Sequence, residues 1–350
     1  MPVKRMFLVC VAMVVAVSLI IGGCTTPAPS TPAPSTPTPT KTVTLKATFY
    51  QPATHTAVVH FKEVFADVET MTEGRVKVDV YDSQTLVKVP ETFDALNRGI
   101  ADLTDVPLPP LRLDVPWWSV EMLPGLLKDR QGMHDAAVNG LMEMYQQAIH
   151  DAGLNIKVLH LFCPGLTYIM TKEKRVAVPT DMAGLKIACF DAPSANIIEM
   201  LGGSGQVIPG PETYEALLRG MVDGATSNTS GLSQYKWQDV CDYLCLQSFG
   251  GPYVATLVSE GALEQLTEAD QQIIIKLAEQ YGLVEELTFA IGENRMLETL
   301  IKPELKEIVT PTPEQAQLWE AAVAPAIDEF LARAGEDGER AVTILRENNP

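Results

Sequence analysis

Apolar residues recur along this chain with two periods, one typical of strands and one typical of helices. Apolar and polar residues alternate over 44–50 and again over 76–80, which predicts two strands with one buried face. Between them, apolar residues recur every three or four positions over 58–71, which predicts a helix. Runs of apolar residues at 155–162 and 185–190 predict buried strands. The mixture indicates an α/β protein.

Two segments far apart in the chain repeat one sequence. Residues 90–102 read PETFDALNRGIAD and residues 211–223 read PETYEALLRGMVD, with Pro, Glu, Thr, Ala, Leu, Arg, Gly and Asp identical. Each copy predicts a short helix, because proline suits a first helical turn and acidic residues favour the positive helix N-terminus. Gly99 and Gly220 are expected to end these helices in the left-handed conformation, and a strand should follow each.

Two copies of one unit predict two lobes built on one plan. Ligands of open α/β sheets bind beyond the carboxyl ends of the strands. The segments that follow the repeats, 105–107 and 227–228, should therefore face one another across a cleft. This is the architecture of a hinged binding protein that closes on its ligand.

A long helix is predicted after the second repeat. Thr267, with Asp270 three residues later, resembles a helix-capping pair, and the helical period continues to Pro303. Gly282 and Gly292 weaken the pattern but do not interrupt it. A helix of this length is expected to run across both lobes. The apolar positions of its stripe are Ile274, Leu277, Tyr281, Val284, Leu287 and Ile291.

The N-terminus reads as an export signal. Basic residues at 4–5 precede an apolar run over 7–21 that is too short to span a bilayer comfortably, and small residues then lead to Cys24. This pattern predicts a bacterial lipoprotein signal peptide at 1–23, with Cys24 as the lipidated first residue. An uncleaved anchor helix is the less favoured alternative, because the run is short and ends at two glycines.

The segment 24–42 is expected to be a stalk. Its six prolines alternate with small polar residues, a composition that favours an extended polyproline conformation. Fully extended, such a stalk reaches roughly 50 Å. We therefore expect an extracytoplasmic protein, in the periplasm or at the cell surface, that is attached to the membrane only through its lipid.

Charge and motifs exclude several functions. Removing Lys4 and Arg5 from the 26 basic residues leaves 24 against 44 acidic ones, a formal charge of −20, which repels nucleic acid and anionic lipid. The sequence contains no Gly-x-Ser-x-Gly elbow, metal-binding helix, phosphate loop or dinucleotide fingerprint. The chain is therefore expected to be no enzyme, to bind no nucleic acid and to carry no cofactor.

The cysteines do not form a metal motif. Cys241 and Cys245 stand four apart on a predicted helix, a separation near the limit for bridging, so buried free thiols are the favoured interpretation. No cysteine spacing resembles a zinc site.

Several segments, in order, carry a family likeness. GRVKVDVYDSQTL before the first repeat, TKEKRVAVPTDMAGLKI, the second repeat and KWQDVCDYL resemble the DctP-type solute-binding proteins of TRAP transporters. The likeness covers most of 43–325. It implies a two-lobed, periplasmic-binding-protein-like fold with a central ligand cleft and a long helix spanning both lobes. Such proteins close over a small organic acid and deliver it to a membrane permease driven by an ion gradient.

The resemblance also implies where the lobes divide. Lobe I is expected to comprise 43–162 plus about 251–305. Lobe II is expected to comprise 163–250 plus the C-terminal helices at about 306–350.

The main anion clamp of the family is missing. The family's ligand carboxylate is usually held by an arginine just after GLKI, because a guanidinium gives two parallel charged hydrogen bonds. That position is Ala188 here, and a second arginine common in the family falls at Tyr168. The polar residue after the second repeat is retained as Ser227 or Asn228. A carboxylate enclosed without a partner would cost several kcal/mol.

Three hypotheses about the ligand follow. The favoured one is a neutral or largely apolar ligand, which excludes simple dicarboxylates. In the second, another cation supplies the charge: Arg112, Lys172, or a metal ion held by Asp191 or Asp105. In the third, the ligand is itself cationic and is gripped by tryptophan and tyrosine faces.

Strand ends and turns supply the remaining candidates. Tyr50 ends the first strand and His55 follows it, one of Trp117 and Trp118 is expected in the cleft, and Trp237 and Phe249 would form an aromatic wall or belong to the core. The full expected set of ligand-binding residues is Tyr50, His55, Trp117, Trp118, Tyr168, Ala188, Asp191, Ser227, Asn228, Trp237 and Phe249.

The resemblance also suggests a disulfide. It places Cys163 and Cys189 on the two strands that lack their usual arginines, and adjacent strands would allow a bridge.

One rival function shares the physics of this cleft. A solute-binding protein of an ATP-driven importer, or a ligand sensor for a membrane kinase, would close in the same way. Only the family likeness favours the TRAP transporter.

Overall fold

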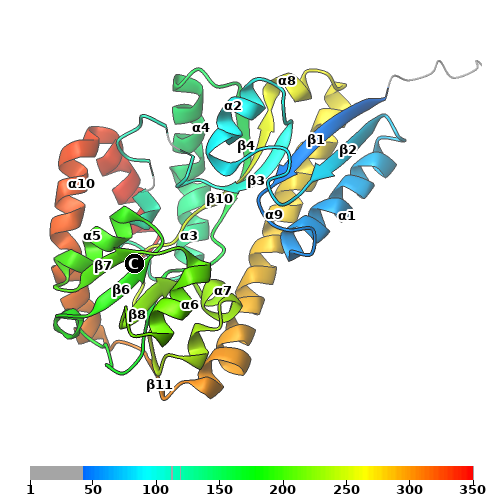
Figure 1. Ribbon diagram of the computed structural model, residues 1–350. Helices are drawn as coiled ribbons and strands as arrows, with labels where there is room; N and C mark the ends of the chain where they lie inside the picture. Colours follow the sequence, from blue (N-terminus) through cyan, green and yellow to red (C-terminus); the bar gives the residue numbers. More distant parts are fainter. Residues whose placement is uncertain (1–41, 112, 119, 350) are drawn as a thin grey trace, which may run out of the picture. The chain divides into compact units, whose positions relative to one another are not determined.

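The computed structural model describes residues 42–111, 113–118 and 120–349, so the expected signal peptide, Cys24, the stalk and Arg112 lie outside the described residues. The described residues belong to one compact unit with two sheets (Figure 1). Sheet A has the order β2-β1-β3-β10-β4 and sheet B the order β11-β9-β5-β8-β6-β7. We call sheet A with its helices lobe I, and sheet B with its helices lobe II. The two-lobed α/β fold expected from the sequence is confirmed.

The strands are short and mostly buried. The strands of sheet A are β1 Val43–Phe49, β2 Val76–Tyr81, β3 Leu103–Pro107, β4 Ile156–Phe162 and β10 Val254–Ser259. Those of sheet B are β5 Tyr168–Thr171, β6 Lys186–Cys189, β7 Ser204–Val207, β8 Gly224–Ser227, β9 Tyr243–Cys245 and β11 Glu307–Val309.

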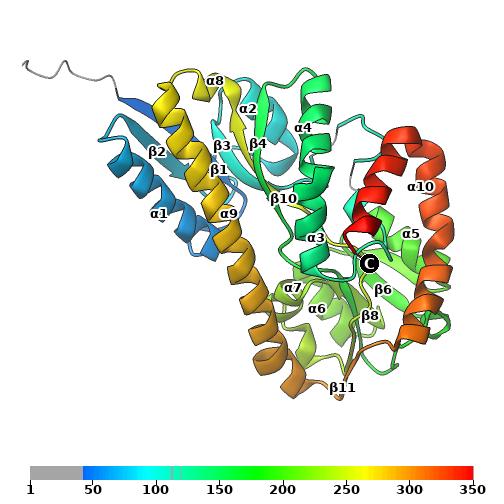
Figure 2. The ribbon, with the colours of Figure 1, turned by 180° about the vertical axis from the view of Figure 1, so that it is seen from behind.

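Helices cover both sheets (Figures 1 and 2). They are α1 Thr56–Met71, α2 Thr92–Asn97, α3 Arg130–Ala136, α4 Met142–Asp151, α5 Ala192–Met200, α6 Gly210–Leu218, α7 Thr229–Gln234, α8 Glu260–Leu263, α9 Glu268–Met296 and α10 Pro313–Glu347. None of them is long and apolar enough to cross a membrane.

The two sheets follow one plan. In sheet A, β1 pairs in parallel with β2 and β3, and β10 runs antiparallel between β3 and β4. In sheet B, β6 pairs in parallel with β7 and β8, and β5 runs antiparallel between β8 and β9. The antiparallel strand of sheet A comes late in the chain, and that of sheet B follows β4 directly. The chain therefore crosses between the lobes at both strands.

The repeated sequence has the same structural role in both lobes. Gly99 and Gly220 each adopt a φ of 68° directly after a helix, as predicted. The closing aspartates then fasten the repeat to the neighbouring parallel strand. The Asp102 carboxylate accepts from the backbone N–H of Lys46 (2.7 Å), and the Asp223 carboxylate accepts from that of Lys186 (2.8 Å).

The helix α9 joins the lobes (Figures 1 and 2). Its first half packs with α1 and β4, where Ile274 and Tyr281 lie in an apolar cluster of lobe I. Its later part contacts α7, and Ile301, which follows it, is fully buried in a cluster of lobe II. The expectation of a long helix spanning both lobes is confirmed.

The predicted apolar stripe of this helix is wrong in its second half. Val284, Leu287 and Ile291 are 56%, 64% and 64% exposed. Glu285 is buried instead, because beyond Tyr281 the helix leaves the apolar core and faces polar groups between the lobes.

The helix α10 contributes to both lobes, although the sequence assigns 306–350 to lobe II. Trp319 packs in a cluster of lobe II, whereas Phe330 and Leu345 pack in the main cluster of lobe I. The helix breaks at Gly335, which has a φ of 61°, and this break reverses its direction (Figure 1).

Two cysteine predictions are wrong. Cys245 lies in the strand β9 and Cys241 precedes it, because pairing with β5 and β11 overrides the local helical pattern. Cys163 follows β4 in sheet A, whereas Cys189 ends β6 in sheet B, so they are not on adjacent strands. All four described cysteines are free and buried. The sequence analysis expected this for Cys241 and Cys245 but not for the other two.

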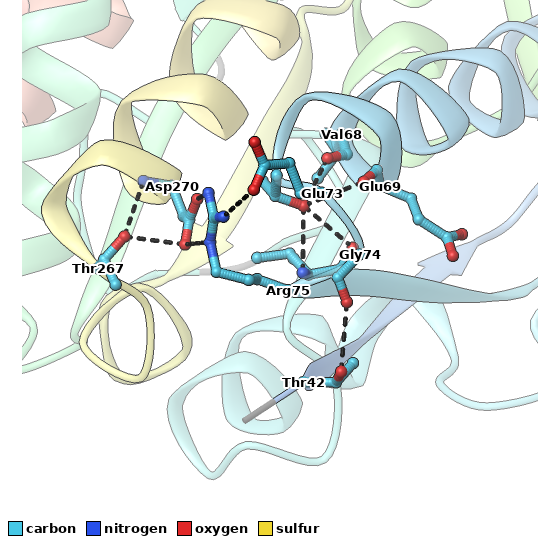
Figure 3. Close-up of polar contacts among 10 residues, drawn as sticks. Thr42, Val68, Glu69, Glu73, Gly74, Arg75, Thr267 and Asp270 are labelled. Carbon is cyan, nitrogen blue, oxygen red and sulfur yellow. Dashed lines mark hydrogen bonds and ion pairs between the residues drawn. The ribbon is translucent and has the colours of Figure 1, made fainter. Parts of the chain in front are cut away.

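An ion pair fixes the N-terminus of α9 (Figure 3). Arg75, directly before β2, donates two hydrogen bonds to the Asp270 carboxylate, at 3.1 and 2.8 Å. Asp270 also accepts from the Thr267 hydroxyl, which caps the helix. The Asp270 side chain is 2% exposed. Its hydrogen bonds with Arg75 lower the pKa of Asp270 below its ordinary value.

We expect Asp270→Asn to lower the free energy of unfolding by about 1–3 kcal/mol, because it leaves the Arg75 charge without its partner. Since the folded-state pKa of Asp270 is depressed, this stabilisation is present above the ordinary aspartate pKa and is lost as the pH falls through the folded-state value. Urea unfolding at neutral and acidic pH measures both effects.

A surface pair provides the control. Glu69 pairs with Lys77 at 2.9 Å, with side chains 47% and 51% exposed, so Glu69→Gln should change the free energy of unfolding by less than about 1 kcal/mol. If both variants lost the same free energy of unfolding, the burial of the Arg75–Asp270 pair would contribute nothing to stability.

Candidate functional site

The expected site residues that lie together are found where the lobes meet. Tyr168 begins β5 and packs against apolar clusters of both lobes. It pairs with Ser227, the last residue of β8, which is 4% exposed. Asn228 follows and caps α7 by accepting from the N–H of Gly231 (2.8 Å). These three residues form the lobe II side of the candidate site.

Ala188 lies in the same sheet but offers no polar group. It pairs with Ala225 of β8 and with Gln206 of β7, and its side chain is 2% exposed in the lobe II core. Asp191, two residues after β6, accepts from the N–H of Ser194 and caps α5. This helix-capping contact accounts for the aspartate without a ligand.

An arginine that the sequence analysis missed reaches this region. Arg130 is the first residue of α3, and its guanidinium donates to the Glu293 carboxylate (2.5 Å) and to the carbonyls of Cys163 and Pro164. Burial raises the pKa of Tyr168, and the positive charge of Arg130 acts in the opposite direction. One sequence signal was present, because a cation in a first helical turn opposes the helix dipole and therefore needs another reason to be there.

The partner of Arg130 connects three helices. Glu293, on α9, accepts from Arg130 on α3 and from the hydroxyl of Thr229 on α7 (3.0 Å). About two turns earlier, Glu286 contacts His134 of α3 at 2.9 Å. The lobe II helix α7 is thus linked to α3 and α9 through side chains that are largely buried.

A second polar group lies on the lobe I side and is acidic. Asp105 of β3 is 0% exposed and Glu285 of α9 is 1% exposed. Burial raises the pKa of both carboxyls, and for Glu285 the charge of Asp105 adds to the effect. Burial, followed by the charges of these two acids, also raises the pKa of Tyr50, which follows β1.

The close approach of α9 to sheet A depends on a glycine. An added Cβ at Gly282 would lie 2.1 Å from the ring of His160, so a larger residue would push the helix away. Burial, with the nearby charge of His134, lowers the pKa of His160 to about 4, so its ring is neutral at physiological pH. His160 of β4 pairs with Thr256 of the neighbouring strand β10, and the Thr256 hydroxyl donates to Asp105 of β3 (3.2 Å).

Aromatic side chains lie between the two polar groups. Phe289, one turn after Glu285, is 5.7 Å from Phe162 and 6.3 Å from His55, measured between ring centroids. His55 also accepts from the N–H of Ala57 and so caps α1. Because 285, 289 and 293 lie four apart, one face of α9 carries an acid, an aromatic ring and a second acid in succession.

The remaining aromatic candidates lie in the cores. Trp117 and Trp118 pack on Tyr145 in lobe I, at 5.1 and 4.9 Å. Trp237 stacks on Tyr235 and Phe190, whereas Phe249 packs on Trp319 in a different cluster. Trp237 and Phe249 therefore form no common wall. A cavity of about 370 Å³ lies beside Trp117 between α4 and α10, and of the expected residues Trp117 alone lines it.

The described residues offer little support for a metal or for Lys172. No group of three or more histidine, cysteine, aspartate or glutamate side chains among them is placed to hold a metal ion. Tyr168 is the first residue of β5, whereas Lys172 directly follows the last one. Burial raises the pKa of Cys241, and the positive charge of Lys172 acts in the opposite direction.

Comparison with known proteins agrees with this architecture. The family model described as DctP, bacterial extracellular solute-binding protein family 7, matches residues 49–334. The C4-dicarboxylate-binding periplasmic protein DctP of Rhodobacter capsulatus is 26% identical over 284 residues, which is 78% of this chain and 82% of that protein. Because this is a family of solute-binding proteins, the expectation that the chain is no enzyme is confirmed.

Solved structures share the fold. A TRAP periplasmic solute-binding protein from Ochrobactrum anthropi, whose C-terminus is bound in the ligand pocket, superposes with a TM-score of 0.79 at 22% identity, covering 88% of this chain and 96% of that one. Another from Chromohalobacter salexigens, with bound D-glucuronate, has a TM-score of 0.74 at 22% identity, covering 87% and 99%. These similarities establish the fold and leave the ligand of this chain open.

The buried acids generate a pH dependence of stability. Because the folded state raises the pKa of Asp105 and Glu285, it holds protons that the unfolded chain has released above the ordinary carboxyl pKa. These two acids should therefore lower the stability of the unliganded protein as the pH rises above about 4.5, by up to about 1.4 kcal/mol per pH unit for each retained proton. His55 and His160 act in the opposite direction below their ordinary pKa of about 6.5, because their lowered folded-state pKa leaves them neutral where the unfolded chain is protonated. Tyr50 and Tyr281 keep their protons in both states over this range and do not change the slope.

Urea unfolding between about pH 6.5 and 8, above the midpoint at which the unfolded histidines titrate, measures this slope. Glu285→Gln should flatten it, and Glu63→Gln, at an exposed position on α1, should leave it unchanged. A slope that is the same in all three proteins would contradict the assignment.

Proposed function

The chain belongs to the DctP family, family 7 of the bacterial extracellular solute-binding proteins, and from this membership we propose that it is the extracytoplasmic solute-binding subunit of a TRAP-type secondary transporter. It captures a small organic solute between its lobes and delivers it to membrane permease subunits. The observation that supports the proposal is the shared strand plan of the two sheets, together with Tyr168, which packs against apolar clusters of both lobes.

The contacts between the lobes suit opening and closure. Two crossing strands and the helices α9 and α10 connect the lobes, and the Glu293–Thr229 hydrogen bond links α9 to α7. Closure requires such connections to act as hinges while the lobes move as bodies. Tyr50, Tyr168, Ser227 and Asn228 are the side chains that we assign to the solute.

We propose that the solute is not a simple dicarboxylate, although a relative from Rhodobacter capsulatus is a C4-dicarboxylate-binding protein. Ala188 stands where the resemblance places the arginine clamp. Arg130 approaches Tyr168, but its charge is matched by Glu293 and by two carbonyls. A solute carboxylate would have to compete with Glu293 for this guanidinium.

The attachment to the membrane is proposed from the sequence. Cys24 is taken as the lipidated residue and 24–42 as the stalk that holds the protein away from the lipid. This places the solute-binding lobes outside the cytoplasm, within reach of the permease.

The proposed function is tested by identifying what the protein binds. Native mass spectrometry of the protein purified from its own cells should detect one small organic molecule per chain, and small-angle X-ray scattering should show a smaller radius of gyration when it is bound. Tyr168→Ala should weaken binding about tenfold or more, because it removes an aromatic contact between both lobes.

Tyr243→Ala is the matched control. Tyr243 is a half-buried tyrosine of the same sheet, in β9, and its removal should leave solute affinity unchanged. A protein that retains no small molecule from cells or cell extract, and whose radius of gyration never changes, would refute the proposed function.

The lipid anchor has a separate test. Cys24→Ala should release the protein from membrane fractions into the soluble fraction, while Cys10→Ala should leave it with the membrane. An intact mass that lacks residues 1–23 and carries added acyl chains would support the proposal, and a soluble wild-type protein would contradict it.

A further inference from the structure

The acids on the lobe I side of the site are more deeply buried than acids normally are. Asp105 comes from the central strand β3 and Glu285 from the helix that covers this face of sheet A. Their exposed fractions are 0% and 1%. The charge of Asp105 raises the pKa of Glu285, so the two carboxyls are close enough to interact. Buried acids are rare in proteins unless a partner balances them.

Within the described part of the chain, several oxygen atoms here have no hydrogen-bond partner. They are one carboxylate oxygen of Asp105, both carboxylate oxygens of Glu285 and the amide oxygen of Gln51. Gln51 is 6% exposed, and its side chain lies beside both Asp105 and Tyr50. Tyr281 approaches Glu285, but its hydroxyl donates to the carbonyl of Ala57 (3.1 Å).

These four oxygen atoms share one chemistry. All of them are acceptors, and leaving a buried acceptor unpaired costs about 1–3 kcal/mol, or more when the group is charged. Protonation of one acid would supply one donor and leave the other acceptors unmatched. A group with several N–H donors and a positive charge would satisfy the set, because an ammonium group offers three donors and no acceptor.

We propose that Asp105, Glu285 and Gln51 form a subsite for the positively charged nitrogen of the transported solute, which is therefore an amine or a zwitterion. This inference rests on the proposed solute-binding function and specifies the ligand class. A metal ion fits this subsite less well, since the described residues hold no group of three histidine, cysteine or acidic side chains placed to bind one.

The position of the subsite connects it to the rest of the candidate site. Glu285 shares a face of α9 with Phe289 and with Glu293, which bonds to lobe II through Thr229. Tyr50 lies beside the acids, and His55 lies beside Phe289. Aromatic faces beside a carboxylate pair suit a cation, which gains both from the negative charge and from the ring quadrupoles.

The surrounding charges favour the same ligand. The whole chain has a formal charge of −18, so its field attracts cations and repels anions during encounter. The charge of Arg130 is balanced locally by Glu293. A solute with an amine at one end can place the amine by Asp105 and extend its other end toward Tyr168 on the lobe II side.

The experiment uses four compounds with the same four-carbon chain and different charges. Thermal unfolding is measured with millimolar putrescine, 4-aminobutyrate, 1,4-butanediol and succinate, and calorimetry follows for those that stabilise the protein. We expect putrescine and 4-aminobutyrate to raise the melting temperature more than butanediol, and succinate to raise it least. Asp105→Asn and Glu285→Gln should each weaken amine binding about tenfold or more.

Glu121→Gln is the matched control. Glu121 is 0% exposed, burial raises its pKa to about 7, and it hydrogen-bonds to Tyr145 in the lobe I core. The variant removes a buried acid elsewhere and should leave amine binding unchanged. Circular dichroism of all three variants confirms that each remains folded.

Three results would overturn the inference. The first is that succinate or butanediol raises the melting temperature as much as the amines do, or that all four compounds change it equally. The second is amine binding that is unaffected by Glu285→Gln. The third is sodium or calcium chloride alone giving the stabilisation that Glu285→Gln abolishes, which would assign the subsite to an inorganic ion.

The two proposals fail in different ways. An anionic or neutral solute that copurifies and binds equally well to Glu285→Gln would refute the cationic subsite and leave the solute-binding function intact. A protein that binds no solute from any source would refute the function itself.

Discussion

A charge that is removed from water needs an opposite charge or several hydrogen bonds, and this requirement governs the polar groups of the candidate site. Arg130 meets it fully, with Glu293 and two carbonyls. Asp105 and Glu285 do not, since three of their four oxygens have no partner in the described part of the chain. The candidate site therefore has two chemically different sides. The arginine on one side has an acidic partner, and the acids on the lobe I side have no cationic one among the described residues.

The helix α9 is the element that creates this polarity. An ion pair with Arg75 fixes its N-terminus to lobe I, and Gly282 allows it to lie against His160. Once it is fixed in this way, its next turns must present Glu285, Phe289 and Glu293 to the region between the lobes. The same helix therefore holds the lobes together and supplies both acidic ends of the site.

Much of the fold could be predicted from local patterns. The repeat predicted its two helices and the left-handed glycines after them, because proline, acidic residues and glycine act on the backbone of their own segment. Local patterns failed where distant partners decided the outcome. Cys245 joined a strand because β5 and β11 were available to pair with it, and Leu287 was left exposed because no core lay opposite.

The sequence alone determined the repeated unit, the long helix and, through its resemblance to the DctP family, the two-lobed plan and the missing arginine at Ala188, since each depends on residue types in a fixed order. It did not reveal Arg130, Glu285 or the neighbours of Asp105. These residues are separated by up to 180 positions (Asp105 to Glu285), and only the packing of α9 and α3 on sheet A brings them together. Whether a buried charge is balanced is a property of distances between segments, so the tertiary structure decided it.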